Sequence, residues 1–232
     1  MQIFVLGLSH KTAPIELREK VAFLPDEARA ALAQLREEGT ASEIALLSTC
    51  NRTEFYAVAE DAPRAAAAQL ALVRDVKQVD LSEHAVTYLH RQRHCVEHLF
   101  RVAGGLDSMV LGEPEILGQV KDAFQLATEN GVTGDVFGRL FPSAFRVGKR
   151  SRSETGIGRG AVSLAKAGVQ LAEKIFGDLR RRSAVVVGAG TGAEAVVRLL
   201  HERPLGELTI ANRTVERAAA LASRVGGRAV SL

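Results

Sequence analysis

Residues 44–58 read IALLSTCNRTEFYAV, two short apolar runs on either side of a polar turn. Apolar runs of this length, bounded by polar residues, are typical of buried strands, so we expect strands at about 43–49 and 54–59. Cys50 then sits at a strand end, where a substrate can reach its thiol. Arg52, two residues later, can hold a planar carboxylate through two parallel hydrogen bonds. On this pattern alone, the interpretation of Cys50 as an inert buried apolar residue stays open.

The composition is that of a soluble globular protein. The 232 residues include 47% hydrophobic and 25% charged residues, without a low-complexity tract, which is enough for two domains with separate cores. No apolar run approaches the roughly 20 residues of a membrane span. The N-terminal MQIFVLGLSHK has no charged segment before its apolar residues and is expected to form a strand, so we expect a cytoplasmic protein.

Charge and cysteine content limit the classes of function. Two cysteines, Cys50 and Cys95, cannot form a disulfide framework. In a reducing compartment a free thiol is instead a candidate for a chemical role. The net charge of +3 permits a polyanionic partner without requiring one. The basic segments 146–152 and 180–182 can contact phosphates. A solvated helix face is the favoured interpretation of each, because neither interleaves aromatic residues for base stacking.

Residues 1–154 mix strands and helices without a regular alternation. Beyond the two strands above, the patterns predict a strand at 3–9 and helices at about 16–23, 25–38, 63–74, 91–103, 115–130 and 135–153. This order indicates an α+β catalytic domain, with a small mixed sheet and helices. A linker is expected at 155–180, with an apolar-rich helix at 161–176.

A second polar cluster lies in residues 106–119, LDSMVLGEPEILGQ. Asp107, Ser108, Glu113 and Gln119 gather there in a loop interrupted by glycine and proline. A loop of this kind between two helices fits a substrate-binding cradle, and a capped helix start at Glu113-Pro114 explains it equally well.

A second domain is expected at 181–232, where residues 183–193 read SAVVVGAGTGA and predict a strand, a glycine turn and a helix. This is the context of a dinucleotide-binding motif, in which the turn and the helix N-terminus face the pyrophosphate. The next strand ends at Asn212 without the acidic residue that binds an NAD ribose, and Arg213 occupies the place for a 2′-phosphate, so NADP is favoured. The residues expected at the cofactor are Gly188, Ala189, Gly190, Thr191, Gly192, Ala193, Asn212, Arg213 and Thr214.

This second domain is short for its class. A complete sheet of the Rossmann type needs about twice these residues, so we expect an incomplete Rossmann-like α/β NADP-binding domain or a fragment of a longer chain. A reactive thiol together with NADPH indicates a definite chemistry. The thiolate attacks an acyl ester to give a thioester, and hydride transfer to the thioester releases an aldehyde. Aminoacyl-tRNA is an ester of this class.

Six stretches carry a more specific resemblance, and they run in order through nearly the whole chain. They are GLSHKTAP (7–14), STCNRTE (48–54), HLFRVAGGLDSMVLGE (98–113), ILGQVK (116–121), RGAVS (159–163), and the turn 188–193 with 212–214. Through them the sequence resembles the glutamyl-tRNA reductase family, whose members make glutamate-1-semialdehyde for tetrapyrrole (porphyrin) biosynthesis.

The resemblance implies roles for particular residues. Cys50 is the implied nucleophile, and His98 matches a histidine that the family needs, for acid–base catalysis or for positioning. The residues implied to line the glutamyl pocket are Thr49, Asn51, Arg52, Ser108, Glu113, Pro114, Glu115 and Gln119. The resemblance also implies NADPH as cofactor, glutamyl-tRNA as substrate, a homodimer formed through a region beyond this chain, and a downstream aminomutase as a candidate partner.

No metal site is expected, because Cys95 with His94 and His98 lacks a fourth ligand. The histidines expected to be solvated or structural are His10, His84, His90 and His201. If the chain is a fragment, we expect it to retain the thiol chemistry and to handle NADPH poorly. Two alternatives remain. One is a shikimate-dehydrogenase-like NADP oxidoreductase, which explains only the last quarter and needs no thiol. The other is a non-catalytic form that binds tRNA or a protein partner.

Overall fold

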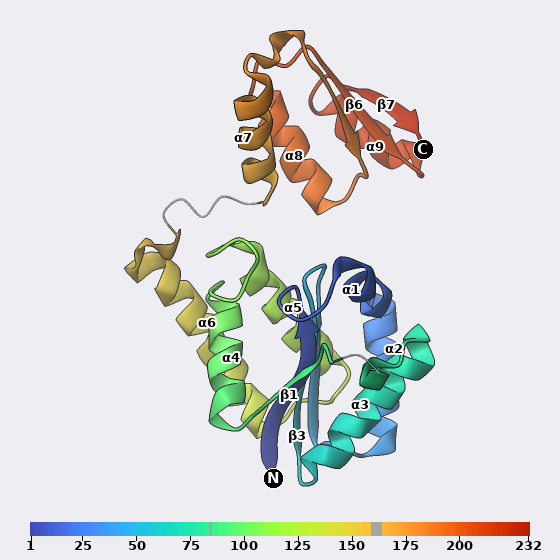
Figure 1. Ribbon diagram of the computed structural model, residues 1–232, viewed down its shortest axis with the longest axis vertical. Coiled ribbons are helices and arrows are strands. Elements are labelled where there is room, and N and C mark those ends of the chain that lie inside the picture. Colours follow the sequence, from blue (N-terminus) through green and yellow to red (C-terminus); the bar gives the residue numbers. More distant parts are fainter. Residues whose placement is uncertain (84, 159–163) are drawn as a thin grey trace. The chain divides into compact units, whose positions relative to one another are not determined.

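The computed structural model describes residues 1–83, 85–158 and 164–232, and the chain divides into two compact units, residues 1–161 and 162–232 (Figure 1). The first unit has an antiparallel sheet with helices and the second has a parallel sheet with helices. The predicted fold class, α+β followed by a Rossmann-like α/β unit, is therefore confirmed.

The sheet of the first unit has four strands in the order β2-β3-β1-β4, and every neighbouring pair is antiparallel. The strands are β2 (Glu43–Ser48), β3 (Arg52–Ala59), β1 (Gln2–Ser9) and β4 (Tyr88–Arg91). β2 and β3 form a hairpin in which Ser48 pairs with Thr53, so residues 49–51 form the turn. β4 was not predicted, and the helix expected from Arg91 begins at Arg93.

Helices cover both faces of this sheet. They are α1 (Ile15–Val21), α2 (Pro25–Glu38), α3 (Ala62–Lys77), α4 (Arg93–Ala103), α5 (Glu115–Glu129) and α6 (Asp135–Glu154), with a short 3-10 helix at Leu81–Glu83. Figure 1 shows α4, α5 and α6 on one side of the sheet and α2 and α3 on the other. On the α6 side, Tyr56 of β3 meets Phe141 edge to face, with ring centroids 6.0 Å apart.

α2 illustrates why these helices form. Its buried residues Ala28, Ala31, Leu32 and Leu35 recur at helical spacing and make one apolar stripe. Pro25 occupies the first turn, where its missing N–H costs nothing, and Gly39 ends the helix in the left-handed conformation at φ 61°.

The second unit has three parallel strands in the order β5-β6-β7. Its elements are β5 (Ser183–Val187), β6 (Glu207–Asn212), β7 (Arg228–Ser231), α7 (Leu164–Phe176), α8 (Thr191–His201) and α9 (Val215–Ser223), with a short 3-10 helix at Leu179–Arg181. Another short 3-10 helix, Gly156–Gly158, belongs to the first unit. Its core gathers apolar side chains from strands and helices, among them Val197 of α8 and Ile210 of β6.

Some expectations fall on residues that the structure does not describe. His84 and the stretch RGAVS at 159–163 lie outside the described residues, as does the predicted start of the linker helix at residue 161. The predicted domain boundaries at 154 and 180 stay predictions. Among the described residues, no helix combines the length and apolar character needed to cross a membrane.

Candidate functional site

The turn between β2 and β3 presents Cys50 with its thiol exposed. Inside the turn, the Thr49 hydroxyl accepts hydrogen bonds from the backbone N–H groups of Asn51 at 3.1 Å and Arg52 at 3.2 Å. From α1, the buried Arg18 donates from Nη1 to the Cys50 carbonyl and to Asn51 Oδ1, both at 2.9 Å. The backbone that carries the thiol is therefore held from within the turn and from α1.

The second cysteine, Cys95, lies in an opposite environment. It is fully buried in the core on α4. Burial, with a smaller contribution from the nearby Glu54 charge, raises the pKa of its thiol to about 12. Since the thiolate is the reactive form, burial and the raised pKa disfavour reaction at Cys95, and Cys50 is the accessible thiol.

Directly after the turn, β3 buries an ion pair between Arg52 and Glu54. The Arg52 side chain is 1% exposed and Glu54 is fully buried. Arg52 Nη1 donates to Glu54 Oε1 at 2.6 Å, and the Tyr56 hydroxyl donates to Glu54 Oε2 at 2.7 Å. On Oε1, Glu54 also accepts a hydrogen bond from the Tyr88 hydroxyl and lies 2.9 Å from His98 Nε2. These partners come from three elements, β3, β4 and α4.

This arrangement keeps the pair charged. Burial by itself would raise the pKa of Glu54, but the Arg52 charge and the contacts with His98 and Tyr88 outweigh it and hold that pKa well below its usual range. Burial by itself would lower the pKa of Arg52. The Glu54 carboxylate outweighs that effect, so the pKa of Arg52 is raised. Burial and the same carboxylate raise the pKa values of Tyr56 and Tyr88, which therefore remain neutral hydrogen-bond donors.

A second carboxylate, Asp107, approaches Arg52 from the loop after α4. Its Oδ2 lies 3.4 Å from Arg52 Nη1 and 3.3 Å from Nη2, and its backbone carbonyl accepts a hydrogen bond from Nη2. Its Oδ1 contacts the Lys11 ammonium. Burial opposes the charge on Asp107, but Lys11 and Arg52 lower its pKa. In this structure the carboxylates that Arg52 contacts are therefore the protein's own.

The His98 ring, which contacts Glu54, packs against two other aromatic rings. The ring centroids of Tyr88, His90 and His98 lie 5.0–5.3 Å apart. Burial and His98 lower the pKa of His90. Also near the turn, the His10 N–H donates to the Asn51 carbonyl at 2.8 Å, and burial together with the Arg52 charge lowers the pKa of His10. His10 and His90, which were expected to be solvated or structural, therefore lie next to the turn and next to His98, and their roles stay predictions.

The predicted cradle at 106–119 combines a loop with a helix start. α5 begins at Glu115 with Pro114 at the N-cap position, where no side chain caps the helix. The cradle and the helix start expected at Glu113-Pro114 therefore share these residues. Arg152 of α6 donates to the Glu113 carbonyl at 2.6 Å and the Pro114 carbonyl at 3.2 Å, which fixes the end of the loop. Burial and the Glu115 charge raise the pKa of Glu113, and the nearby Ser108 and Arg52 oppose that shift.

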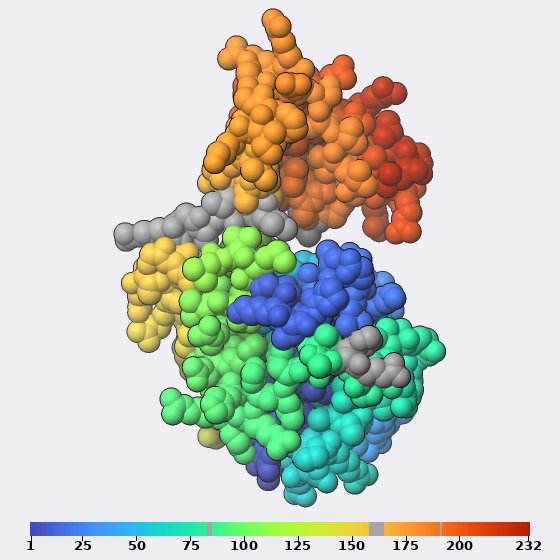
Figure 2. Space-filling view, viewed as in Figure 1, coloured from blue at the N-terminus to red at the C-terminus, as the bar shows by residue number. Residues whose placement is uncertain are grey.

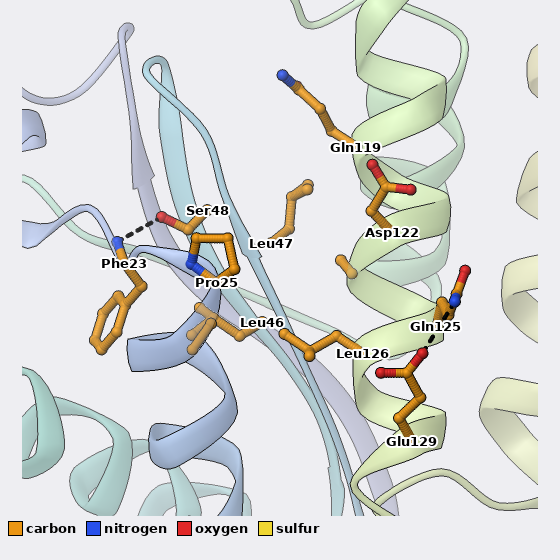
Figure 3. Close-up of a pocket in the computed structure, with 12 residues that line it drawn as sticks. Phe23, Pro25, Leu46, Leu47, Ser48, Gln119, Asp122, Gln125, Leu126 and Glu129 are labelled. Carbon is orange, nitrogen blue, oxygen red and sulfur yellow. Dashed lines mark hydrogen bonds between the residues drawn. The ribbon is translucent and has the colours of Figure 1, made fainter. Parts of the chain in front are cut away.

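Gln119, one turn into α5, lines a cavity of about 400 Å³ between β2, α5 and the start of α2 (Figure 3). Figure 3 shows Ser48 across from α5, where its hydroxyl accepts a hydrogen bond from the Phe23 N–H at 2.8 Å. Leu47 lines the cavity from β2, and Asp122 lines it from α5. Gln119 thus lines a cavity whose β2 wall ends two residues before Cys50.

In the second unit, the turn after β5 has the shape that a dinucleotide phosphate requires. Gly188 has φ +103°, a conformation that side chains disfavour, and its N–H donates to the Ala211 carbonyl at 2.7 Å. A Cβ built on Gly190, the N-cap of α8, meets no atom within 4 Å, so the approach to the helix N-terminus is open. These residues fit a pyrophosphate.

The end of β6 is consistent with a phosphorylated ribose. Asn212 Nδ2 donates to the Thr214 carbonyl at 2.9 Å, which shapes this end, and Arg213 is exposed beside it. An exposed guanidinium there suits a 2′-phosphate better than a ribose hydroxyl. Among the described residues, no group of three or more His, Cys, Asp or Glu side chains is arranged to hold a metal ion.

Several residues of the site were not predicted as such. Arg18 contacts Cys50, Glu54 contacts Arg52 and Lys11 contacts Asp107. Tyr56 and Tyr88 reach the site through their hydrogen bonds to Glu54. A signal existed for two of them, because alternate residues of a strand share a face, and Arg52, Glu54 and Tyr56 are alternate residues of β3. No pattern near Arg18, Lys11 or Tyr88 indicated its long-range partner.

Comparisons with known proteins agree with this division of the chain. Residues 6–155 match the family described as "Glutamyl-tRNAGlu reductase, N-terminal domain", and residues 170–232 match "Shikimate / quinate 5-dehydrogenase". A glutamyl-tRNA reductase of Rubrobacter xylanophilus is 51% identical, and one of Alcanivorax borkumensis is 49% identical, each over 100% of this chain. The chain spans about half the length of these curated relatives, 54% and 55% respectively.

A solved structure agrees as well. "Glutamyl-tRNA Reductase from Methanopyrus kandleri" is 38% identical to this chain and superposes with a TM-score of 0.63. The match covers 99% of this chain and 54% of that one.

Proposed function

This chain belongs to the glutamyl-tRNA reductase family, and from that premise we propose that its Cys50 forms the thioester in the NADPH-dependent reduction of glutamyl-tRNA to glutamate-1-semialdehyde, a step of tetrapyrrole biosynthesis. The observation that supports this most directly is the exposed Cys50 thiol on a turn fixed by Arg18, next to the buried Arg52–Glu54 pair. A surface cysteine without a function needs no such support.

The proposed first step is acyl transfer to the thiol. Cys50 Sγ bonds to the glutamyl carbonyl carbon, the ester C–O bond breaks, and the terminal ribose oxygen of the tRNA leaves with a proton. Thr49, Asn51, Arg52, Ser108, Glu113, Pro114, Glu115 and Gln119 are proposed to hold the glutamyl group. His98 is proposed either to move that proton or to hold the substrate, and its contact with Glu54 fixes its ring in both cases.

The second step releases the aldehyde. Bound NADPH would supply a hydride for the thioester carbon, and the chain's own part in this step would be to release that carbon from Cys50 as the thiolate. The proposed binding residues are the turn 188–193 for the pyrophosphate and Asn212, Arg213 and Thr214 for the phosphorylated ribose. The chain's own contribution is to orient the cofactor through backbone N–H groups and one guanidinium.

A trapping experiment tests the proposal. The chain is mixed with tRNA charged with labelled glutamate. We expect the label on the Cys50 peptide, and we expect hydroxylamine to remove it. The Cys50→Ser variant should stay unlabelled. Added NADPH tests the second step by conversion of the label to semialdehyde. Label on another residue, or the same labelling of Cys50→Ser, would contradict the proposal.

The match of residues 170–232 supports a second candidate, an NADP oxidoreductase resembling shikimate dehydrogenase. This activity needs no thiol. NADP-dependent oxidation of shikimate at an equal rate by the parent chain and Cys50→Ser would favour it. Binding of tRNA without a thioester would instead favour a non-catalytic binding role.

Partners and location follow from the family as further proposals. We propose glutamyl-tRNA as the substrate, with a cytoplasmic site of action. Dimerisation and contact with a downstream aminomutase are proposed for the whole enzyme of the family and rest on no contact in this chain.

A further inference from the structure

Arg52 is too buried to meet a substrate in the arrangement that the structure shows. Its side chain is 1% exposed, with Glu54 Oε1 at 2.6 Å from Nη1. Asp107 contacts the same guanidinium at 3.3–3.4 Å. The two carboxylates are therefore held differently. Glu54 meets Arg52 through a short hydrogen bond within β3, whereas the Asp107 carboxylate meets it through longer Oδ2 contacts, with its Oδ1 on Lys11 and its backbone carbonyl on Arg52 Nη2. A ligand that reaches Arg52 has to take the place of Asp107.

The position of Asp107 favours such an exchange. Its side chain is 11% exposed, and the Lys11 ammonium that contacts Oδ1 is half exposed. The blue N-terminal segment and the green segment that follows α4 meet on one surface of the first unit (Figure 2). The loop exposes its large apolar side chains, Leu106, Met109 and Leu111, so its movement uncovers little apolar area. Within the loop, the Gly112 N–H donates to the Gly105 carbonyl at 2.9 Å. Amide exchange at Gly112 therefore reports whether the loop keeps this conformation.

The charges of the cluster point the same way. Two cations, Arg52 and Lys11, balance two carboxylates, Glu54 and Asp107. A third carboxylate added to Arg52 would leave one buried negative charge without a partner, which is costly. If Asp107 moves away from the buried Arg52 and keeps the half-exposed Lys11, the excess negative charge lies on the solvent side of the cluster, and the incoming carboxylate takes the vacated position on Arg52.

We propose that Asp107 occupies the outer side of Arg52 in the ligand-free protein and gives way to the side-chain carboxylate of the glutamyl substrate, while Lys11 holds Asp107 after it moves. Asp107 and Lys11 are then positioning residues that set the preference for a carboxylate over an amide. The inference rests on the proposed function, since it takes the glutamyl group as the ligand of Arg52.

The test compares two small acyl donors, the α-benzyl thioesters of glutamate and of glutamine, by mass spectrometry of Cys50 acylation. We expect Asp107→Asn to lower the half-saturating concentration of the glutamyl donor at least threefold and to leave that of the glutaminyl donor unchanged. Lys11→Met is expected to raise the half-saturating concentration of the glutamyl donor, because Arg52 is then the only cation that pairs with Asp107. The double variant should equal Asp107→Asn, since Lys11 acts through Asp107.

A matched control is Asp75→Asn, which removes an exposed carboxylate on α3 and should change neither donor. An unchanged or lower preference for the glutamyl donor in Asp107→Asn, or additive effects of the two substitutions, would overturn the inference. If the parent chain is acylated by neither donor, the proposed function fails. Amide exchange with glutarate then decides the inference separately. Faster exchange at Gly112 with glutarate and not with glutaramide supports the displacement of Asp107, and equal exchange refutes it.

Discussion

Gly7 of β1 lies directly opposite Glu54 of β3, and a Cβ built on Gly7 would come within 2.7 Å of Glu54 Cγ. On its other side, Gly7 pairs with Tyr88 of β4, whose hydroxyl donates to the same carboxylate. The absence of a side chain at this one position of β1 therefore leaves the space in which Glu54 meets its partners. The buried pair next to Cys50 depends on a glycine more than 40 positions earlier in the chain.

The first prediction concerns Gly7→Ala. The added methyl has to displace Glu54 or the backbone of β3, so we expect a loss of about 2 kcal/mol in the free energy of unfolding, within the usual range for overpacking. Denaturant unfolding followed by circular dichroism measures it. Gly138→Ala is the control, because its Cβ on an exposed face of α6 meets no atom within 4 Å and alanine should stabilise that helix. Equal stability of the two variants would contradict the role given to Gly7.

The second prediction concerns the charge of Glu54. Glu54→Gln leaves the buried Arg52 without its closest carboxylate, and we expect a loss of about 3 kcal/mol in the free energy of unfolding. Glu129→Gln, which breaks an exposed pair with Arg29, should leave the free energy of unfolding nearly unchanged, because solvent screens exposed pairs. A smaller loss for Glu54→Gln than for this control would show that the buried pair is not stabilising.

The third prediction is the pH dependence of that same difference. The pKa of Glu54 is lowered in the folded protein, so its contribution is fully present above the unfolded value of about 4.3 and decreases as the pH falls toward the folded value. We therefore expect the difference in stability between the parent chain and Glu54→Gln to be constant from pH 8 to 6 and to shrink from pH 4.5 downward. Urea unfolding across this range measures it. A difference that grows on acidification would contradict the assignment.

The sequence predicts the hairpin around Cys50 well, because both strands have apolar patterns of their own. The strand β4 was missed because Tyr88–Arg91 is a short, half-polar stretch whose partner is β1, more than 80 residues away. The same limit applies to the site. The pattern around residue 52 indicates a carboxylate clamp, but only the fold brings Asp107 onto Arg52. The residue roles themselves stay predictions until the reaction is measured.

The fourth prediction separates the two thiols. Cys50 is exposed, and Cys95 is buried with its pKa raised to about 12, so iodoacetamide at pH 7.5 should modify one thiol per folded chain. Peptide mapping by mass spectrometry should place it at Cys50, and Cys50→Ser should take up none. In denaturant both cysteines should react. Modification of Cys95 at a similar rate in the folded protein would contradict the described burial.

The last prediction concerns Glu43 of β2, which ties the sheet to the start of α6. Its Oε1 accepts from the Val136 N–H at 3.0 Å and its Oε2 from the Phe137 N–H at 2.7 Å, at a helix start whose N-cap, Gly134, has no side chain. Glu43→Ala leaves these two donors without that acceptor, so we expect a loss of about 1–3 kcal/mol in the free energy of unfolding.

The matched control for this prediction is Glu38→Ala, at the exposed end of α2, which should change stability by less than about 0.5 kcal/mol. Glu43→Gln keeps one acceptor oxygen and should fall between the two. Amide exchange at Val136 and Phe137 should accelerate in Glu43→Ala more than at the C-terminal end of α6, because the carboxylate caps only the first turn. Uniform acceleration along α6 would show that Glu43 supports the packing of the whole helix instead of its N-terminus.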